Sequence, residues 1–400
     1  MGWERSVGTD APPMKKNHPP FGLATRRSFF RQVSVGAAAL SLTTRVRAQP
    51  SSAASAAAPR KLGIALVGLG GYATGQLAPA LRLTQGVELR GVVTGSLEKG
   101  RKWAQDFGFS EKNIYSYDKM SRLADNPDID LVYVVTPNAL HPEHTIAAAW
   151  AGKHVISEKP MATTVADCNA MLAACRANKV KLSIGYRLQF EPHFNELKRL
   201  AREKDFGPFM KMSGGLSFKM TRPQWRAERK LAGGGPLMDL GIYALQAACM
   251  AADSTSSPQA GSGAPVAVTA RELPKQRPEF FRDVEETIEW TMEFAGGARG
   301  EFSTSYNQGL DLFRAEAEKG WIEFAPAFQY GGLKVVTSKG PFTPAVPPSQ
   351  QAGQIDDFAR CIREGRESPV SGAMGRRDMV IIEAIYKSAA QGGKRIEINA

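Results

Sequence analysis

The stretch LGIALVGLGGYA at residues 62–73 decides the fold that this chain is predicted to adopt. Its first six residues predict a buried strand. The pattern G-x-G-x-x-A at Gly68, Gly70 and Ala73 ends that strand before a helix predicted over 74–83. Gly68 permits a tight turn, Gly70 lets a ligand approach the backbone, and Ala73 keeps helix and strand close. The pattern is weak alone, but its place between strand and helix favours a dinucleotide-binding turn over an ordinary connection.

The residues after this turn alternate between strand and helix patterns. Strands are predicted at 87–93, 129–135 and 154–157, and a helix is predicted at 141–150. Such alternation is typical of a parallel, doubly wound sheet of the α/β class. We therefore predict a Rossmann domain at 61–182, which binds ligands at the carboxyl ends of its strands.

The length, charge and cysteine content of the chain limit the kinds of partner that it is predicted to bind. The chain has 400 residues, enough for two domains, and half of its net charge of +12 lies in residues 1–48. No basic stripe interleaved with aromatic residues occurs, so no nucleic-acid partner is predicted. The four cysteines form no C-x-x-C pair, so no metal site is predicted, while a single disulfide bond stays open.

Residues 1–48 contain the three parts of an export signal. Paired arginines at 26–27 precede a short apolar run at 33–42, and a small-x-small site follows at 46–48. This order resembles a twin-arginine signal peptide, whose route exports folded proteins. We predict a periplasmic protein with no stable membrane association after export, because the run is too short to span a bilayer. Residues 49–60 are rich in Ala and Ser and predict a flexible arm.

The end of the second strand distinguishes between the two nicotinamide dinucleotides. NAD-binding proteins usually place an acid there, against the ribose hydroxyls. Here the strand is followed by Thr94, Gly95 and Ser96, and then by the cations Lys99 and Arg101. Hydroxyl groups and cations suit a 2′-phosphate, so we predict NADP as the cofactor. A role for Ser96 as a helix N-cap is compatible with this prediction.

A second glycine-led stretch, GGGPLMDLGIY at residues 233–243, carries the predicted chemistry. Asp239 and Tyr243 are four residues apart at the start of a helix, so they share one helical face. The three glycines ahead of them are expected to let a ligand approach. Upstream, the triplet Glu158-Lys159-Pro160 follows a predicted strand, and its proline is a candidate for a cis peptide bond.

These residues fit the oxidation of a hydroxyl-bearing carbon, which needs a base for the O–H proton. We predict Tyr243 as the general acid/base and Lys159 as its neighbour, because an ammonium near a phenol favours the phenolate. Asp239 would either hold a substrate hydroxyl or orient Lys159. Each residue also has a structural interpretation, as a half-buried aromatic, a surface cation and an acid at a helix N-terminus. Their joint occurrence in a dinucleotide-binding chain favours catalysis.

Five stretches in a fixed order carry a resemblance to a known family. The chain resembles the glucose–fructose oxidoreductase branch of the glucose–fructose oxidoreductase/inositol dehydrogenase (Gfo/Idh/MocA) family, from about residue 61 to near the C-terminus. Tyr243, where many relatives carry His, fits that branch, whereas Gly71 replaces a cation of the glucose–fructose enzymes. The stretches are VGLG at 67–70, TPNALH at 136–141, GKHVISEKPMA at 152–162, IGYR at 184–187 and residues 233–243.

The resemblance implies a second domain, which we place at 183–400. It would be an α+β domain with a large, mainly antiparallel open sheet that binds substrate and mediates a homo-oligomer, either a dimer or a tetramer. The later sequence agrees, since residues 285–294 alternate with a period of two and present a mostly apolar face. Further strands are predicted at 300–306 and 321–324, and two closing helices at 354–364 and 376–390.

The predicted site combines the motifs with the resemblance. Tyr186 and Arg187 either contact a ligand or pack, Asn138 and His141 either line the nicotinamide pocket or serve structure, and Trp225 and Arg226 belong to a loop over the site or to an interface. The predicted catalytic residues are Lys159, Asp239 and Tyr243. The predicted substrate-binding residues are Lys159, Tyr186, Asp239 and Tyr243. The predicted cofactor-binding residues are Gly68, Leu69, Gly70, Gly71, Tyr72, Thr94, Gly95, Ser96, Lys99, Thr136, Pro137, Asn138, His141, Glu158, Lys159 and Arg187.

The resemblance also implies an activity. The expected protein is an exported sugar oxidoreductase with tightly bound NADP, which oxidises an aldose at C1 to the lactone and reduces a second sugar, an aldose or a ketose, to the alditol. One alternative is an NADP-dependent sugar, inositol or diol dehydrogenase with an exchangeable cofactor. Another is a sensor that binds the dinucleotide without catalysis. The filled lysine, aspartate and tyrosine positions favour an enzyme over a sensor.

Overall fold

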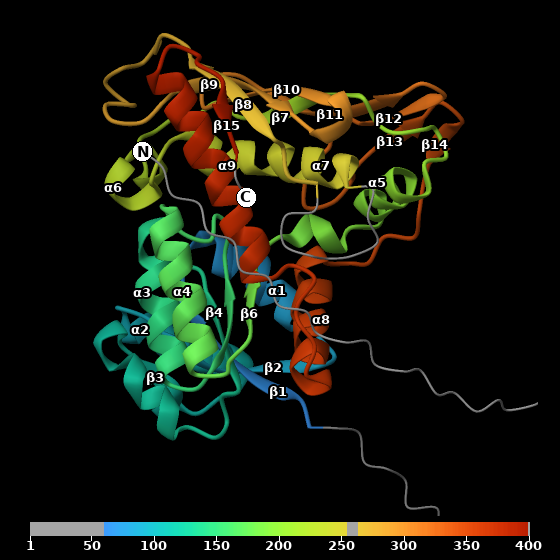
Figure 1. Ribbon diagram of the computed structural model, residues 1–400. Coiled ribbons are helices and arrows are strands. Elements are labelled where there is room, and N and C mark those ends of the chain that lie inside the picture. The colour runs from blue at the N-terminus through green and yellow to red at the C-terminus, as the bar shows by residue number, and fades with distance from the viewer. Residues whose placement is uncertain (1–59, 254–262, 399–400) are drawn as a thin grey trace, which may run out of the picture. The chain divides into compact units, whose positions relative to one another are not determined.

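Two β-sheets organise the part of the chain that the structure describes. The computed structural model describes residues 60–253 and 263–398. Figure 1 shows a first, blue-to-green sheet flanked by helices and a second sheet above it in yellow and orange. The predicted signal peptide at 1–48, and the predicted arm at 49–60 except for Arg60, lie outside the described residues.

The first sheet has six strands in the order β3-β2-β1-β4-β5-β6, and all of its pairs are parallel. This arrangement confirms the predicted doubly wound α/β sheet. The order reverses between β1 and β4, where ligands bind in folds of this kind. The strands are β1 Leu62–Val67, β2 Val87–Val93, β3 Ile114–Tyr115, β4 Leu131–Val134, β5 His154–Ser157 and β6 Leu182–Ile184.

Helices cover both faces of this sheet (Figure 1). The helix predicted over 74–83 is present, as a π-helical turn at Ala73–Leu77 that continues into α1, Ala78–Leu81, so it ends two residues earlier than predicted. Pro79 in the first turn of α1 has no N–H to donate, so it interrupts a continuous hydrogen-bond ladder. The remaining helices of this region are α2 Leu97–Phe107, α3 His141–Trp150 and α4 Val165–Ala177.

The second sheet has nine strands and is mainly antiparallel, as the resemblance implied. Only β7 and β10 pair in parallel, and the order is β14-β13-β12-β11-β7-β10-β9-β8-β15. The strands are β7 Lys211–Ser217, β8 Ala267–Glu272, β9 Thr287–Glu293, β10 Arg299–Ser305, β11 Leu310–Ala317, β12 Gly320–Phe324, β13 Val335–Thr337, β14 Gly340–Phe342 and β15 Ile396–Glu397.

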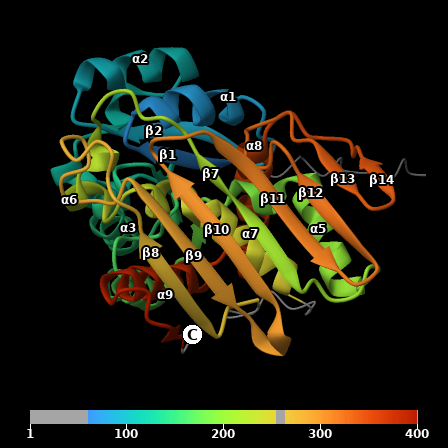
Figure 2. The same cartoon turned by 90° about the horizontal axis from the view of Figure 1, so that it is seen from above.

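One face of the second sheet is packed on helices and the other is open. On β9 the side chains of Ile288, Trp290 and Met292 are buried, which confirms the alternation read from the sequence. Figure 2 looks onto the opposite face, which no helix of the described chain crosses. The helices that follow the first domain are α5 Pro192–Glu203, α6 Arg229–Ala232, a π-helical turn Leu237–Gly241, α7 Ile242–Ala252, α8 Gln350–Glu364 and α9 Gly372–Ala390. The 3₁₀ turns are Glu111–Asn113, Tyr117–Asp125, Asn138–Leu140, Arg187–Phe190, Trp225–Ala227 and Ala295–Gly297.

Helix α8 joins the two sheets. Although it follows β14 of the second sheet in sequence, its residues Ile355, Phe358 and Ala359 pack into the core of the first sheet. The predicted boundary after residue 182 falls inside β6, and residues 58–400 form one compact unit. The division into 61–182 and 183–400 therefore stays a prediction.

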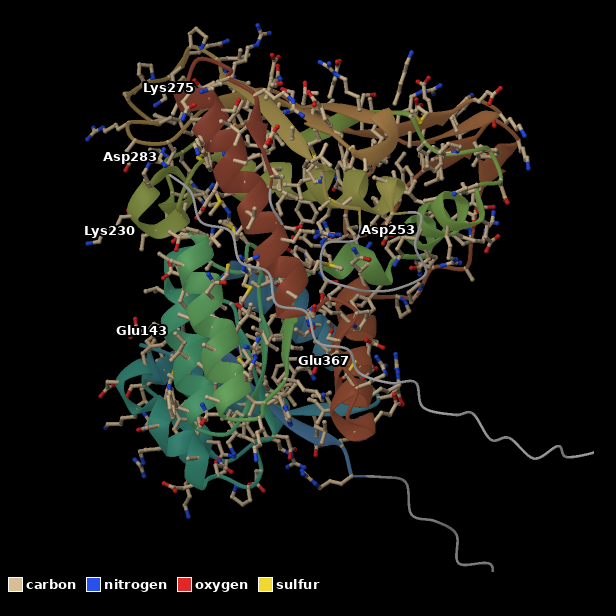
Figure 3. The ribbon with its side chains drawn as sticks, viewed as in Figure 1. Glu143, Lys230, Asp253, Lys275, Asp283 and Glu367 are labelled. Atoms are coloured by element: carbon tan, nitrogen blue, oxygen red, sulfur yellow. The ribbon has the colours of Figure 1, made fainter. Side chains whose placement is uncertain are left out.

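The periphery is polar and the interior excludes most charges. Figure 3 shows Glu143 and Lys230 pointing outward from α3 and α6. No helix within residues 60–253 and 263–398 is long and apolar enough to cross a membrane. All four cysteines are buried and unpaired, so the disulfide bond that the sequence left open does not form. The described residues contain no group of three or more His, Cys, Asp or Glu side chains placed to hold a metal ion.

Candidate active site

A cavity of about 1360 Å³ opens where the strands of the first sheet end below the second sheet. The segments after β1, β2, β4 and β5 line one side. The other side is lined by Leu216 of β7, by Asp239 and Tyr243 from the π-helical turn and α7, and by Tyr330 from the loop between β12 and β13. Every residue predicted to bind the cofactor lines this cavity, as do all three predicted catalytic residues. Of the predicted site, only Tyr186 does not.

The turn after β1 leaves room for a ligand against the backbone. Gly68 has φ +102°, and a Cβ there would lie 3.1 Å from Thr136, so the fold itself requires glycine. A Cβ at Gly70 or Gly71 would meet no atom within 4 Å. Ala73 is fully buried against the first sheet. The cradle that a side chain at Gly70 would fill fits the pyrophosphate of a dinucleotide.

The segment after β2 offers one cation to this cavity rather than two. Ser96 caps α2, since its hydroxyl accepts a hydrogen bond from the Lys99 N–H at 3.3 Å. The ammonium of Lys99 forms no ion pair with any residue that the structure describes. Arg101, the second cation noted in the sequence, instead pairs with Glu111 at 3.2 Å and lies outside the cavity.

Asn138 and His141 line the cavity, but the backbone occupies their polar groups. The Asn138 amide donates to the Ala232 carbonyl at 2.9 Å. The two ring nitrogens of His141 lie 2.9 Å and 2.8 Å from the carbonyl oxygens of Pro160 and Thr136. Burial lowers the pKa of His141 to about 4, although both carbonyls act to raise it. His141 thus ties the loop after β4 to the loop after β5, and Asn138 ties the loop after β4 to α6, which is the structural role that the sequence left open.

Lys159 and Asp239 come together as predicted. The Lys159 ammonium donates to the Asp239 carbonyl oxygen at 2.6 Å and lies 3.4 Å from Oδ1 of the same residue. The peptide bond between Lys159 and Pro160 is cis, as the sequence allowed. The ammonium also lies 4.6 Å from the centre of the Tyr243 ring. The Lys159 ammonium thus contacts Asp239 and lies over the ring of Tyr243 at the same time.

The Asp239 carboxylate is shared by two cations. Its Oδ2 lies 3.0 Å from Nε of Arg226 and accepts a hydrogen bond from the Tyr306 hydroxyl at 3.1 Å. Burial acts to raise the pKa of Asp239, but Lys159 and Arg226 together lower it on balance. Lys159, Arg226 and Tyr306 together hold the Asp239 carboxylate in place, an arrangement that suits the orientation of Lys159, while its contact with a substrate hydroxyl stays a prediction.

Tyr243 is half-buried between two cations. Besides Lys159, the guanidinium of Arg187 lies with Cζ 4.9 Å from the centre of its ring. Phe328 packs nearby, with the two ring centres 6.0 Å apart. The phenol lies at the wall of the cavity, where it can reach a ligand.

The glycine run at 233–235 serves packing rather than ligand approach, which corrects the prediction made for it. A Cβ at Gly234 would lie 2.0 Å from the Tyr386 hydroxyl, and one at Gly235 would lie 2.2 Å from the Glu285 carbonyl oxygen. The buried Glu285 carboxylate accepts hydrogen bonds from the N–H groups of Gly235 and Leu237 at 2.9 Å and 3.1 Å, and from Tyr386 at 2.8 Å. It thereby holds the start of the segment that carries Asp239 and Tyr243.

Tyr186 lies behind the cavity, so the structure does not support its predicted contact with substrate. Arg187, the first residue of the 3₁₀ turn that follows β6, lines the cavity instead. The Tyr186 side chain is buried beside Asp378 and Arg377.

Several site residues were not predicted. Trp225 and Arg226, which the sequence left open, do line the cavity. Glu285 follows Val284 directly before a strand with an apolar face, and a carboxylate in such surroundings is the one sequence signal for this residue. Other unpredicted residues that line the cavity or contact its side chains are Tyr117, Tyr306, Phe328, Tyr330 and Gln350.

A dinucleotide-binding turn that faces a lysine, a carboxylate and a tyrosine defines the class of a nicotinamide-dependent oxidoreductase. The model of the oxidoreductase family with an NAD-binding Rossmann fold matches residues 62–186, and the model of the GFO/IDH/MocA C-terminal domain matches residues 194–323. The chain belongs to the Gfo/Idh/MocA family of oxidoreductases.

Several relatives are named for their action on sugars or inositol. The chain is 40% identical to the aldose–aldose oxidoreductase of Caulobacter crescentus, solved in complex with glycerol, with a TM-score of 0.80 over 85% of this chain and all of that one. It is 28% identical to the D-xylose 1-dehydrogenase [NADP(+)] of Haloarcula marismortui, over 81% of this chain and 90% of that protein. It is 26% identical to the scyllo-inositol 2-dehydrogenase (NADP(+)) IolW of Bacillus subtilis, over 83% and 96%. Family and relatives indicate a sugar oxidoreductase that acts on CH–OH groups.

Proposed function

We propose that this chain is a periplasmic sugar oxidoreductase that retains NADP, oxidises an aldose at C1 to the lactone, and reduces a second sugar to the alditol. The observation that carries the proposal is the meeting of Lys159, Asp239 and Tyr243 in the cavity that the dinucleotide-binding turn also lines. The 40% identity to an aldose–aldose oxidoreductase over all of that chain supports this reaction over others in the family.

The proton follows a short path in this mechanism. Tyr243 accepts the proton of the C1 hydroxyl while the C1–O bond becomes the carbonyl of the lactone. The chemistry that NADP supplies when bound is the transfer of the hydride between the two sugars. When the second sugar is reduced, Tyr243 returns the proton to the carbonyl oxygen that becomes a hydroxyl of the alditol. Both half-reactions therefore use the same phenol.

Lys159 positions the sugar in this account. An ammonium has three N–H donors, and Asp239 accepts from Lys159 through its carbonyl oxygen and its carboxylate. The remaining donor is available for the oxygen that reacts. Asp239, held in turn by Arg226 and Tyr306, fixes the direction of that donor. A small displacement of this chain of contacts would misalign the sugar.

The choice of NADP rests on the segment after β2. No acid follows β2 where NAD-binding proteins place one. The hydroxyl groups of Thr94 and Ser96 accept hydrogen bonds from the backbone N–H groups of Ser96 and Lys99. Lys99, without a carboxylate partner among the described residues, supplies a cation for the 2′-phosphate. The relatives that carry NADP(+) in their names support this choice.

Export and assembly form part of the proposal. The signal at 1–48 would deliver the folded protein with its cofactor to the periplasm, where an enzyme that recycles bound NADP needs no external supply. The open face of the nine-stranded sheet is the surface proposed for a dimer or tetramer. Light scattering of the purified protein tests the assembly, and a monomer would contradict it.

The reaction is tested with the purified protein and a single aldose, without added coenzyme. The lactone, or the acid that forms from it, and the alditol are expected in equal amounts. Absorbance and mass spectra of the same preparation are expected to show bound NADP. If products appear only after NADP is added, the retained-cofactor proposal is wrong.

A dehydrogenase with an exchangeable cofactor is the second candidate, because the xylose and inositol relatives are named as dehydrogenases. Extensive dialysis separates the two functions. Activity that is lost on dialysis and restored by NADP, with one reduced coenzyme formed for each sugar oxidised, would favour the second candidate.

A further inference from the structure

We propose that Arg187 is a positioning residue for catalysis, whose buried charge stabilises Tyr243 as a phenolate. This role differs from the cofactor contact predicted from the sequence and rests on the proposed function of Tyr243 as proton acceptor. It also modifies that function, because Lys159 is then not the main charge that favours the phenolate.

The protein fixes the guanidinium of Arg187 on several sides. Nη1 donates to the Gln329 carbonyl at 3.0 Å and to Oε1 of Gln350 at 2.5 Å, and Nη2 donates to the Phe328 carbonyl at 2.5 Å. Only 3% of the residue is exposed. Because these donors are used within the protein, Arg187 cannot offer its fork to a phosphate without breaking them.

No carboxylate of residues 60–253 or 263–398 forms an ion pair with Arg187, and its Nε–H has no hydrogen-bond partner among them. A buried cation of this kind destabilises the fold unless an anion compensates its charge. Besides the uncharged oxygens that accept hydrogen bonds from it, two aromatic rings lie against the guanidinium, with Cζ 4.2 Å from the ring centre of Tyr330 and 4.9 Å from that of Tyr243. A phenolate at Tyr243 would supply the missing anion.

Lys159 is less suited to this task. Its ammonium lies against Asp239, whose negative charge compensates it, while Arg187 has no such partner among the described residues. Burial acts to lower the pKa of Arg187, but the phenol groups around it, Tyr243 first, raise it on balance. The coupling between the guanidinium and the phenol therefore agrees with their geometry.

The charge balance around Tyr243 can be followed element by element. Its own segment contributes Asp239, the segment after β5 contributes Glu158 and Lys159, and Arg187 follows β6. Tyr330 reaches in from the loop between β12 and β13, and Tyr72 follows β1, with the ring centres of these two tyrosines 6.3 Å apart. The negative charges of Asp239 and Glu158 destabilise a phenolate at Tyr243. Removal of either Lys159 or Arg187 is therefore expected to disfavour the phenolate further.

The substitution Gln350→Glu tests the proposal with little change of shape. It places a carboxylate at the position that now accepts from Arg187 at 2.5 Å, so it keeps the hydrogen bond and neutralises the charge. The ultraviolet absorbance of phenolate, taken as the difference between each protein and its Tyr243→Phe counterpart, is measured against pH in the protein as purified. We expect the Tyr243-dependent signal to appear about one pH unit higher than in the wild type.

Arg187→Met removes the charge altogether and is expected to move the same signal upward by about one to three pH units, while Arg187→Lys restores part of the shift. The basic limb of kcat/KM against pH should move with it. Arg314→Met is the matched control, because Arg314 also lies over an aromatic ring, 4.3 Å from Trp321, but outside the cavity. It is expected to leave the titration unchanged.

The titration needs no sugar and no turnover, so failure of the proposed reaction would leave its outcome readable. A Tyr243-dependent signal that appears at the same pH in Gln350→Glu and in the wild type would overturn the proposal, whether or not Arg187→Met folds. An upward shift in Gln350→Glu but not in Arg314→Met supports it.

Discussion

Two glycine-led segments line or support the same cavity, and they use glycine for opposite reasons. At Gly70 and Gly71 a side chain would enter open space, whereas at Gly234 and Gly235 it would strike protein within about 2 Å. The first segment leaves room for a ligand, and the second lets Tyr386 and Glu285 come close enough to hold the catalytic helix. The same residue type thus marks a binding surface in one place and tight internal packing in the other.

The two segments also differ in how far their partners lie along the chain. The turn after β1 is stabilised by neighbouring strands of one parallel sheet, and the Gly68 N–H donates to the Val93 carbonyl. The segment at 233–243 depends on Glu285, Tyr306 and Tyr386, which arrive from distant parts of the chain. We expect changes in the first to affect cofactor binding, and changes in the second to affect catalysis or stability.

The largest effect is expected from Tyr243→Phe. Loss of the general acid/base should lower kcat by about 10²- to 10⁴-fold, while bound NADP and thermal stability stay near the wild-type values. Tyr115→Phe is the matched control, because Tyr115 is buried outside the cavity and its hydroxyl contacts only Asn126 among the described residues. Turnover that survives in Tyr243→Phe would show that the phenol is not the proton acceptor.

Glycine-to-alanine changes test the comparison itself. Gly235→Ala forces a methyl group against the Glu285 carbonyl and is expected to lower the free energy of unfolding by about 1–3 kcal/mol. Gly70→Ala should leave that free energy within about 0.5 kcal/mol but lower NADP content or affinity by about tenfold. Chemical denaturation measures the free energy of unfolding, and nucleotide analysis measures the NADP content. Equal destabilisation by the two changes would contradict the distinction drawn between the segments.

His141 links the loops of the cofactor side and the Lys159 side, and it makes stability depend on pH. Its pKa of about 4 in the fold lies below the ordinary value of 6.5, so the unfolded chain binds a proton that the folded chain does not. Stability should therefore fall as the pH drops from about 6.5 to 4, by up to about 3 kcal/mol. The free energy of unfolding of the wild type and of His141→Gln is measured by denaturation across this pH range. If it changes with pH by the same amount in both proteins, His141 is not the cause.

The smallest effect is expected at Lys99. Lys99→Ala should weaken NADP binding by about tenfold and leave NAD binding nearly unchanged, because only NADP carries the 2′-phosphate. Arg101→Ala is the control on the same helix, since Arg101 pairs with Glu111 outside the cavity. The affinities for NADP and NAD are measured by calorimetry or fluorescence titration. An equal loss of affinity for the two nucleotides would contradict the assignment of Lys99 to the 2′-phosphate.

The features that could be predicted from the sequence are those set by residues close together in the chain, and the features that could not are set by distant contacts. Period and turn chemistry predicted the parallel sheet and the cofactor turn, because strand, glycine turn and helix lie within a few residues of one another. The meeting of Lys159 with Asp239 agrees with the inference from spacing and resemblance. Tyr306 and Gln350 escaped prediction because antiparallel pairing and the return of α8 bring them in from distant parts of the chain, and no local pattern records such contacts. Glu285 has a local signal, its place directly before an apolar strand, but that signal does not identify its partners at 235–237.

The most direct test of the central claim follows the hydride of the aldose. The purified protein is given an aldose deuterated at C1, with no added coenzyme, and the alditol is analysed by mass spectrometry. The account predicts an alditol with two deuterium atoms at C1, one its own and one transferred, in an amount equal to the lactone and formed about 10²- to 10⁴-fold more slowly by Tyr243→Phe. An alditol that gains no second deuterium, or no alditol at all, would contradict the account.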